Sequence, residues 1–188
     1  MAARLFLEGL ARPLLVVHAI GAAALVAAST HHLLWCRSYL SGRFVRVHAE
    51  RRFALIVSLL FVGNFVLGAS LYPTYKVRVR AEYLDSQAAA TDEARLRQAA
   101  RLGPPDSKKD AIVGQSLMPV ARTFDIKEHF MALAVAVSLA LLWLSRRAHP
   151  QDEPRIAPLY VGLSALICLS TWSGAIIGLY VTMVRPIG

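Results

Sequence analysis

Long apolar runs separated by charged segments dominate the pattern of this chain. Residues 13–36 (PLLVVHAIGAAALVAASTHHLLWC) carry no formal charge and are long enough to cross a bilayer as one helix. Three further apolar runs follow, and the third is so short that we expect its helix to begin near residue 124. The pattern therefore predicts an all-α integral membrane protein, a single membrane domain (1–188) forming a four-helix bundle with transmembrane helices at about 13–36, 53–72, 124–145 and 158–184.

Residues 73–122, between the second and third predicted helices, are too many for a hairpin, and we expect them to form an extramembrane cap. Their first part, YPTYKVRVRAEYLD, alternates charged and apolar positions, and this period of two predicts an extended segment. The stretch 86–103 is rich in Ala, Gln, Arg and Leu and ends at a Gly-Pro-Pro sequence, which predicts a surface helix.

The charges in the short loops predict an orientation. The loop 37–52 contains five arginines and one acid, and the loop after the third helix is also basic. The positive-inside rule places both loops in the cytoplasm, so the cap and both termini would lie outside, in a bacterial inner membrane. The rival orientation remains open, because the cap is basic too and Arg4 and Arg12 favour a cytoplasmic N-terminus.

Composition and motifs exclude several classes of function. The net charge of +9 is spread over both sides of the predicted membrane, so anionic lipid accounts for it and nucleic acid is set aside. Cys36 and Cys168 form no CxxC pair and are expected to be free thiols packed as small hydrophobes. No hydrolase, transferase or thiol-redox motif is present, and an enzymatic activity has no support beyond electron transfer.

Histidines inside the apolar runs are the main candidates for a site, because a polar ring in a membrane helix needs a partner. The first helix holds His18, His31 and His32. His18 and His32 project on nearly the same face, within roughly 40°, and stand about 21 Å apart along the helix axis. This spacing resembles that of the paired axial histidines in membrane di-haem cytochromes b, which implies haem b as a cofactor.

Each haem iron needs a second axial ligand, and histidine is the usual choice. His129 lies about as deep in the third helix as His18 does in the first, so we expect these two residues to hold one outer haem b. For His32 or His31, the available partners His48 and His149 both lie in predicted loops, and an inner haem therefore lacks a facing ligand within a helix.

Two interpretations of function follow. In the first, the protein is a b-type haem-binding subunit that passes electrons between a quinone and a redox partner protein. In the second, it is a cofactor-free subunit that anchors a larger membrane complex or homo-oligomer, through its cap and the small-residue face at Ser170, Gly174 and Gly178. A bound metal or quinone without haem also stays open, although copper fits poorly because Met131 stands alone. Asn64, in the middle of the second helix, is expected to face the bundle and bond another helix.

Overall fold

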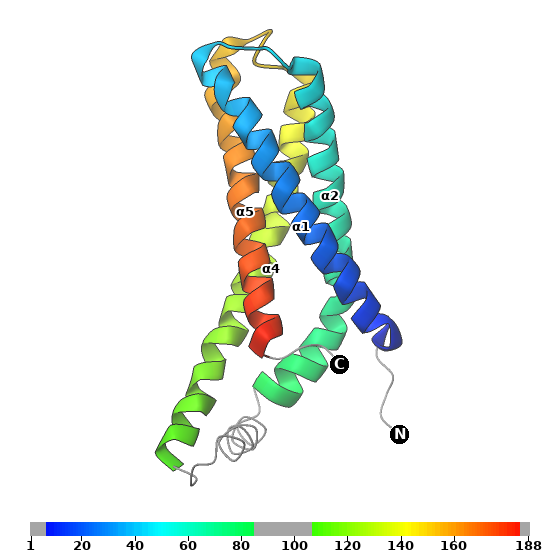
Figure 1. Ribbon diagram of the computed structural model, residues 1–188, viewed down its shortest axis with the longest axis vertical. Helices are drawn as coiled ribbons and strands as arrows, with labels where there is room; N and C mark the ends of the chain where they lie inside the picture. The colour runs from blue at the N-terminus through cyan, green and yellow to red at the C-terminus, as the bar shows by residue number, and fades with distance from the viewer. Residues whose placement is uncertain (1–6, 85–106, 185–188) are drawn as a thin grey trace.

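The computed structural model describes residues 7–84 and 107–184, and every regular element in this part of the chain is a helix. Four long helices carry the fold (Figure 1). In chain order the elements are the 3-10 turn η1 (Glu8–Leu10), α1 (Ala11–Cys36), the 3-10 turn η2 (Arg37–Ser41), α2 (Val47–Thr74), the π-helix η3 (Tyr75–Leu84), α4 (Ser107–Arg147), the 3-10 turn η4 (Pro154–Ile156) and α5 (Ala157–Val184).

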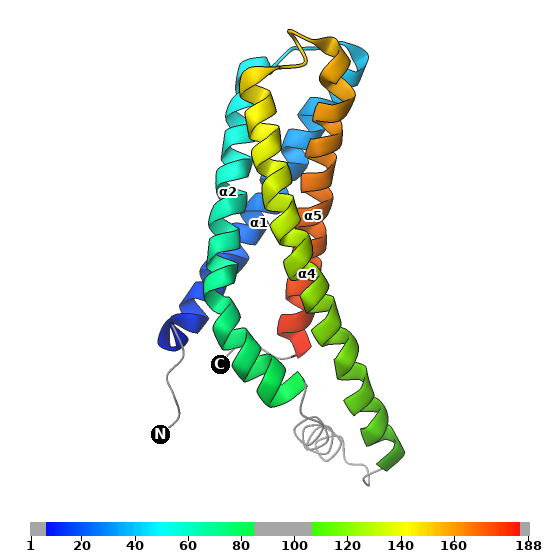
Figure 2. The ribbon, with the colours of Figure 1, turned by 180° about the vertical axis from the view of Figure 1, so that it is seen from behind.

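The four long helices occupy the corners of a square. Helix α1 packs against α2 and α5, and α4 packs against the same two helices, so α1 and α4 stand at opposite corners. One end of the bundle, which we call the loop end, carries the short connections 42–46 and 148–153 (Figures 1 and 2). The opposite end, where α1 begins and α5 ends, is called the terminal end.

All four helices are long and apolar enough to cross a membrane. The candidate spans are Ala11–Ser41, Val47–Ala81, Arg122–Arg147 and Pro154–Met183, and each overlaps one of the four predicted transmembrane helices. Large apolar side chains on the outer faces are more than half exposed, Ile20, Leu59 and Leu133 among them. Water would be a poor solvent for such a surface, whereas lipid chains cover it without cost, so the fold indicates a multi-pass membrane protein.

The prediction of an extended segment after the second helix is wrong. Helix α2 runs to Thr74, and residues 75–84 continue it as the π-helix η3. The contacts between η3 and α4 include the ring of Tyr75, which stacks on Phe124 with 3.7 Å between centroids, and the ion pair of Arg80 with Asp125. Packing against α4 therefore overrides the alternation of charged and apolar residues.

A separate cap is not shown by the residues that the structure describes. The third candidate membrane span begins at Arg122, close to the predicted start near residue 124, but helix α4 itself begins earlier, at Ser107. The surface helix predicted at 86–103 falls outside the described residues.

Small and hydroxyl-bearing residues allow the helices to approach one another. Ser29 Oγ lies 2.8 Å from Thr171 Oγ1, a hydrogen bond that joins α1 to α5. A methyl group built at Gly174 would come 2.9 Å from the sulfur of Met131 on α4. The predicted small-residue face of α5 thus packs on a neighbouring helix, as expected for close helix contacts in a membrane.

Candidate functional site

A cavity of about 490 Å³ lies within the terminal half of the bundle. Small-molecule and cofactor sites typically measure about 300–1,000 Å³, and this one has their usual character, an apolar wall with a few polar groups. All four long helices contribute to it. The polar and charged lining residues are His18, Asn64, Tyr72, Lys127, Glu128, His129 and Thr171.

The two histidines that the sequence analysis paired, His18 and His129, line this cavity from opposite corners of the bundle. Nδ1 of His18 is 3.1 Å from the backbone oxygen of Asn64, and Nδ1 of His129 is 2.8 Å from the backbone oxygen of Asp125. A carbonyl oxygen only accepts, so each Nδ1 carries the proton and donates it. Each Nε2 then keeps its lone pair, which is the tautomer that a metal ligand requires.

Asn64 reaches the cavity wall from the middle of α2. It faces the bundle, as predicted, but its side-chain oxygen is buried without a hydrogen-bond partner among the described residues. The predicted bond from its amide to another helix is therefore not formed at this oxygen. The same oxygen would lie 2.7 Å from a methyl group built at Gly21, so α1 approaches α2 closely here because residue 21 is glycine.

Lys127 is the one lysine among the residues lining the cavity. Its ammonium nitrogen lies 5.5 Å from the centroid of the Phe124 ring and would lie 3.2 Å from a methyl group at Gly178. The side chain therefore extends between α4 and α5 rather than along the outer surface. Lys127 and its neighbour Glu128 thus bring one basic and one acidic side chain to the lining of a mostly apolar cavity.

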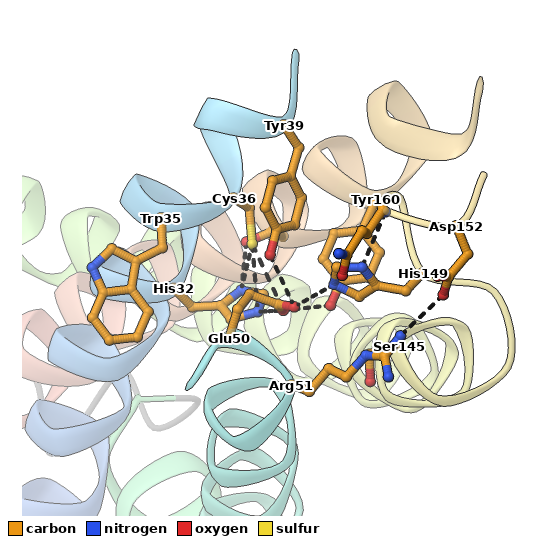
Figure 3. A network of polar contacts seen from close by, with 12 residues as sticks. His32, Trp35, Cys36, Tyr39, Glu50, Arg51, Ser145, His149, Asp152 and Tyr160 are labelled. Carbon is orange, nitrogen blue, oxygen red and sulfur yellow. Dashed lines mark hydrogen bonds and ion pairs between the residues drawn. The ribbon is translucent and has the colours of Figure 1, made fainter. Parts of the chain in front are cut away.

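A second polar group lies at the loop end, where the carboxylate of Glu50 is completely buried (Figure 3). Oε1 accepts a hydrogen bond from His32 Nε2 at 2.7 Å and another from the Tyr160 hydroxyl. Oε2 accepts from His149 Nε2 at 2.9 Å and, more weakly, from the Tyr39 hydroxyl at 3.4 Å. We call these five residues together with Cys36 the Glu50 cluster.

Contacts outside the carboxylate fix the two imidazoles of the Glu50 cluster. The backbone N–H of Gln151 donates to Nδ1 of His149 at 3.1 Å, so the proton of that ring sits on Nε2 and points at Glu50. Because a carboxylate oxygen only accepts, Nε2 of His32 is protonated as well, facing Glu50 Oε1. The Ser164 hydroxyl, 2.8 Å from Nδ1, then donates to that atom of the neutral ring.

The histidines of the first helix separate into three environments. His18 lines the cavity, His32 belongs to the Glu50 cluster, and His31 points outward, with its ring 4.3 Å from that of Trp35. His32 and His149 do meet, but through one carboxylate that lies between their Nε2 atoms. That arrangement leaves no space for a macrocycle between the two rings. In this structure His32 bonds the Glu50 carboxylate and the Ser164 hydroxyl instead of facing a haem iron.

Sequence reasoning missed Glu50, which it counted as the single acid of a basic loop. The structure starts α2 at Val47, and Glu50 shares one helix face with the buried residues Ala54, Val57 and Phe61. That spacing of four, three and four residues is the helical repeat of a core-facing stripe and would have identified Glu50 as buried. Cys36 is a buried free thiol within the hydrophobic core, as expected, and it also lies beside an imidazole and a carboxylate.

No protein-family model, curated protein or solved structure matches this chain. The fold and the two groups of polar side chains therefore carry the functional argument alone.

Proposed function

We propose that this protein is a b-type haem-binding electron-transfer subunit of a membrane, with its cofactor in the cavity at the terminal end. The observation that carries the proposal is that His18 and His129, on helices at opposite corners of the bundle, line one cavity. A macrocycle in this cavity would lie between helices of opposite corners, with His18 on α1 and the more exposed His129 on α4 as its candidate ligands. Histidine pairs are the usual axial ligands of low-spin b haem.

Three features of the lining residues fit this group. The volume of about 490 Å³ is in the range for cofactor sites. The backbone carbonyls of Asn64 and Asp125 hold both imidazoles in the ligand tautomer, as the outer partners of metal-bound histidines generally do. Lys127 supplies a cation for a propionate carboxylate.

Haem b would supply a one-electron couple, and the chain would determine where that couple lies and at what potential. The apolar walls, Phe61 and Phe65 among them, would limit the access of water to the ring and would favour its state of lower charge. Quinones in the bilayer and a redox partner outside it are the proposed donor and acceptor. The proposed orientation places this cavity near the outer, periplasmic face of a bacterial inner membrane, because the arginine-rich loop 37–52 lies at the opposite end.

The experiment is a visible spectrum of the detergent-purified protein from cells supplied with excess haem precursor. We expect a Soret band and, on reduction with dithionite, the sharp alpha band of a bis-histidine haem. His18→Ala and His129→Ala should each abolish or convert this species, because each removes one axial ligand. His48→Ala is the matched control, because that histidine is exposed and lies at the loop end, far from the cavity.

Added imidazole sharpens the test, because a small free ligand can replace a deleted side chain in a preformed cavity. Partial return of the low-spin spectrum in His18→Ala would place that ring on the iron. A colourless wild-type protein that also fails to bind added haem would contradict the proposal and favour the cofactor-free anchoring subunit. Loss in His18→Ala with no effect in His129→Ala would contradict the His129 assignment, and Met131, which also lines the cavity, would be the next ligand to test.

A further inference from the structure

Three side chains of the Glu50 cluster lie close enough together to hold a metal ion, and they come from two helices. His32 and Cys36 lie one turn apart on α1, and Glu50 lies in the first turn of α2. Their ligand atoms all lie within 4.8 Å of one another, and all three residues are buried. We propose that His32 Nε2, Cys36 Sγ and Glu50 Oε1 form a zinc site at the loop end, separate from the haem cavity and independent of that proposal.

The separations between the ligand atoms are close to those around a tetrahedral ion. Zinc bonds of about 2.0–2.3 Å place neighbouring ligand atoms about 3.3–3.6 Å apart. Cys36 Sγ lies 3.5 Å from His32 Nε2 and 3.9 Å from Glu50 Oε1. Only the pair His32 Nε2 and Glu50 Oε1, at 2.7 Å, must open, by roughly 0.6 Å, because these two atoms are now joined directly by a hydrogen bond.

The side chains around these three ligands match the outer partners of a metal site. Nε2 of His32 must lose its proton to bind zinc, so its hydrogen bond to Glu50 would be replaced by the metal bond. Nδ1–H can then donate to Ser164, which keeps the contact on the other side of the ring. His149 and Tyr160 donate to the Glu50 carboxylate and hold its orientation. His149 itself is not a ligand, because the Gln151 N–H fixes its proton on Nε2.

Charge and ligand type both favour zinc over other ions. A divalent ion balanced by the Glu50 carboxylate and the Cys36 thiolate leaves the buried group neutral, which is the condition under which charges are tolerated away from water. Thiolate, imidazole and carboxylate together are typical of zinc, whereas magnesium and calcium prefer oxygen alone and monovalent copper prefers sulfur. The bound ion would connect the end of α1 to the start of α2.

The test uses the full chain, purified in detergent by an affinity tag that does not chelate metals, from cells grown with added zinc. Elemental analysis should find about one zinc per chain. After removal of zinc with a chelator, Co²⁺ should produce a sulfur-to-cobalt charge-transfer band in the near ultraviolet. Cys36→Ser should abolish this band and weaken zinc binding at least tenfold, whereas Cys168→Ser, at the other buried cysteine, should change neither.

Substoichiometric zinc and no charge-transfer band in folded wild-type protein would overturn the proposal and leave the Glu50 cluster as a metal-free hydrogen-bond network. Unchanged zinc binding in Cys36→Ser would also overturn it, as would stoichiometric copper or iron in place of zinc at these residues. Since the wild-type measurement needs no substitution, the test remains decisive even if a variant fails to fold. Haem content, read by its spectrum, tests the other site and is not affected by these outcomes.

Discussion

Replacement of Glu50 by alanine removes the acceptor at the centre of the Glu50 cluster. Three donors point at this carboxylate with good geometry, from His32 at 2.7 Å, from His149 at 2.9 Å and from the Tyr160 hydroxyl. All three donors belong to residues with at most 1% of their surface exposed, so water does not reach them in the native packing. Glu50→Ala therefore leaves several buried polar groups without a partner.

The expected loss follows from the number of orphaned donors. Each buried donor left unsatisfied costs about 1–3 kcal/mol, reduced where water enters the space that the side chain vacates. We expect Glu50→Ala to lower the free energy of unfolding by on the order of 4 kcal/mol, comparable with the breaking of a buried ion pair. Glu50→Gln should lower the free energy of unfolding by roughly half as much. Its carbonyl oxygen can still accept hydrogen bonds, whereas its amide NH₂ only donates and would face the donors that now bond the second carboxylate oxygen.

Thermal unfolding in detergent, followed by near-ultraviolet circular dichroism of the aromatic residues, measures this loss. A change of that size corresponds to a fall in melting temperature of roughly 10 °C for a chain of this length. Glu153→Gln is the matched control, because that acid is exposed at the same end of the bundle and should melt within about 2 °C of wild type. The ranking holds with or without zinc, since His149 and Tyr160 donate to the carboxylate in both states. A Glu50→Ala protein that melts with wild type would refute the reasoning, as would a control that is equally destabilised.

Further substitutions test the helix contacts and the orientation. Gly21→Ala should be less stable than Gly63→Ala by about 1 kcal/mol or more in the same melting assay. A methyl group at residue 21 meets Asn64 Oδ1 on α2 at 2.7 Å, whereas residue 63 faces open space, and equal stabilities would contradict that contact. Gly174→Leu should drive its side chain into Met131 and lower the melting temperature; no change would mean that the face of α5 is not packed. In a background without the native cysteines, Ser41→Cys should react with an impermeant maleimide only after lysis of the cells, and labelling of intact cells would invert the proposed orientation.

The sequence by itself determined the four membrane helices. Uncharged runs such as 13–36 have few alternatives, because a bilayer accepts only segments that satisfy their own backbone hydrogen bonds. The sequence also indicates how deep a residue lies along its helix, because the rise per residue of an α-helix is fixed. His18 and His129, which have matched depths by this measure, both line one cavity.

Tertiary structure decided what local pattern could not. The alternating segment after Thr74 is helical because contacts between Tyr75 and Phe124 on a distant part of the chain outweigh its period of two. Glu50 reads as a surface acid among arginines, yet it is buried because α2 starts earlier than its apolar run and turns that residue toward α1 and α5. Its partners lie up to 110 positions away in the chain, so only the packing of the helices could bring the Glu50 cluster together.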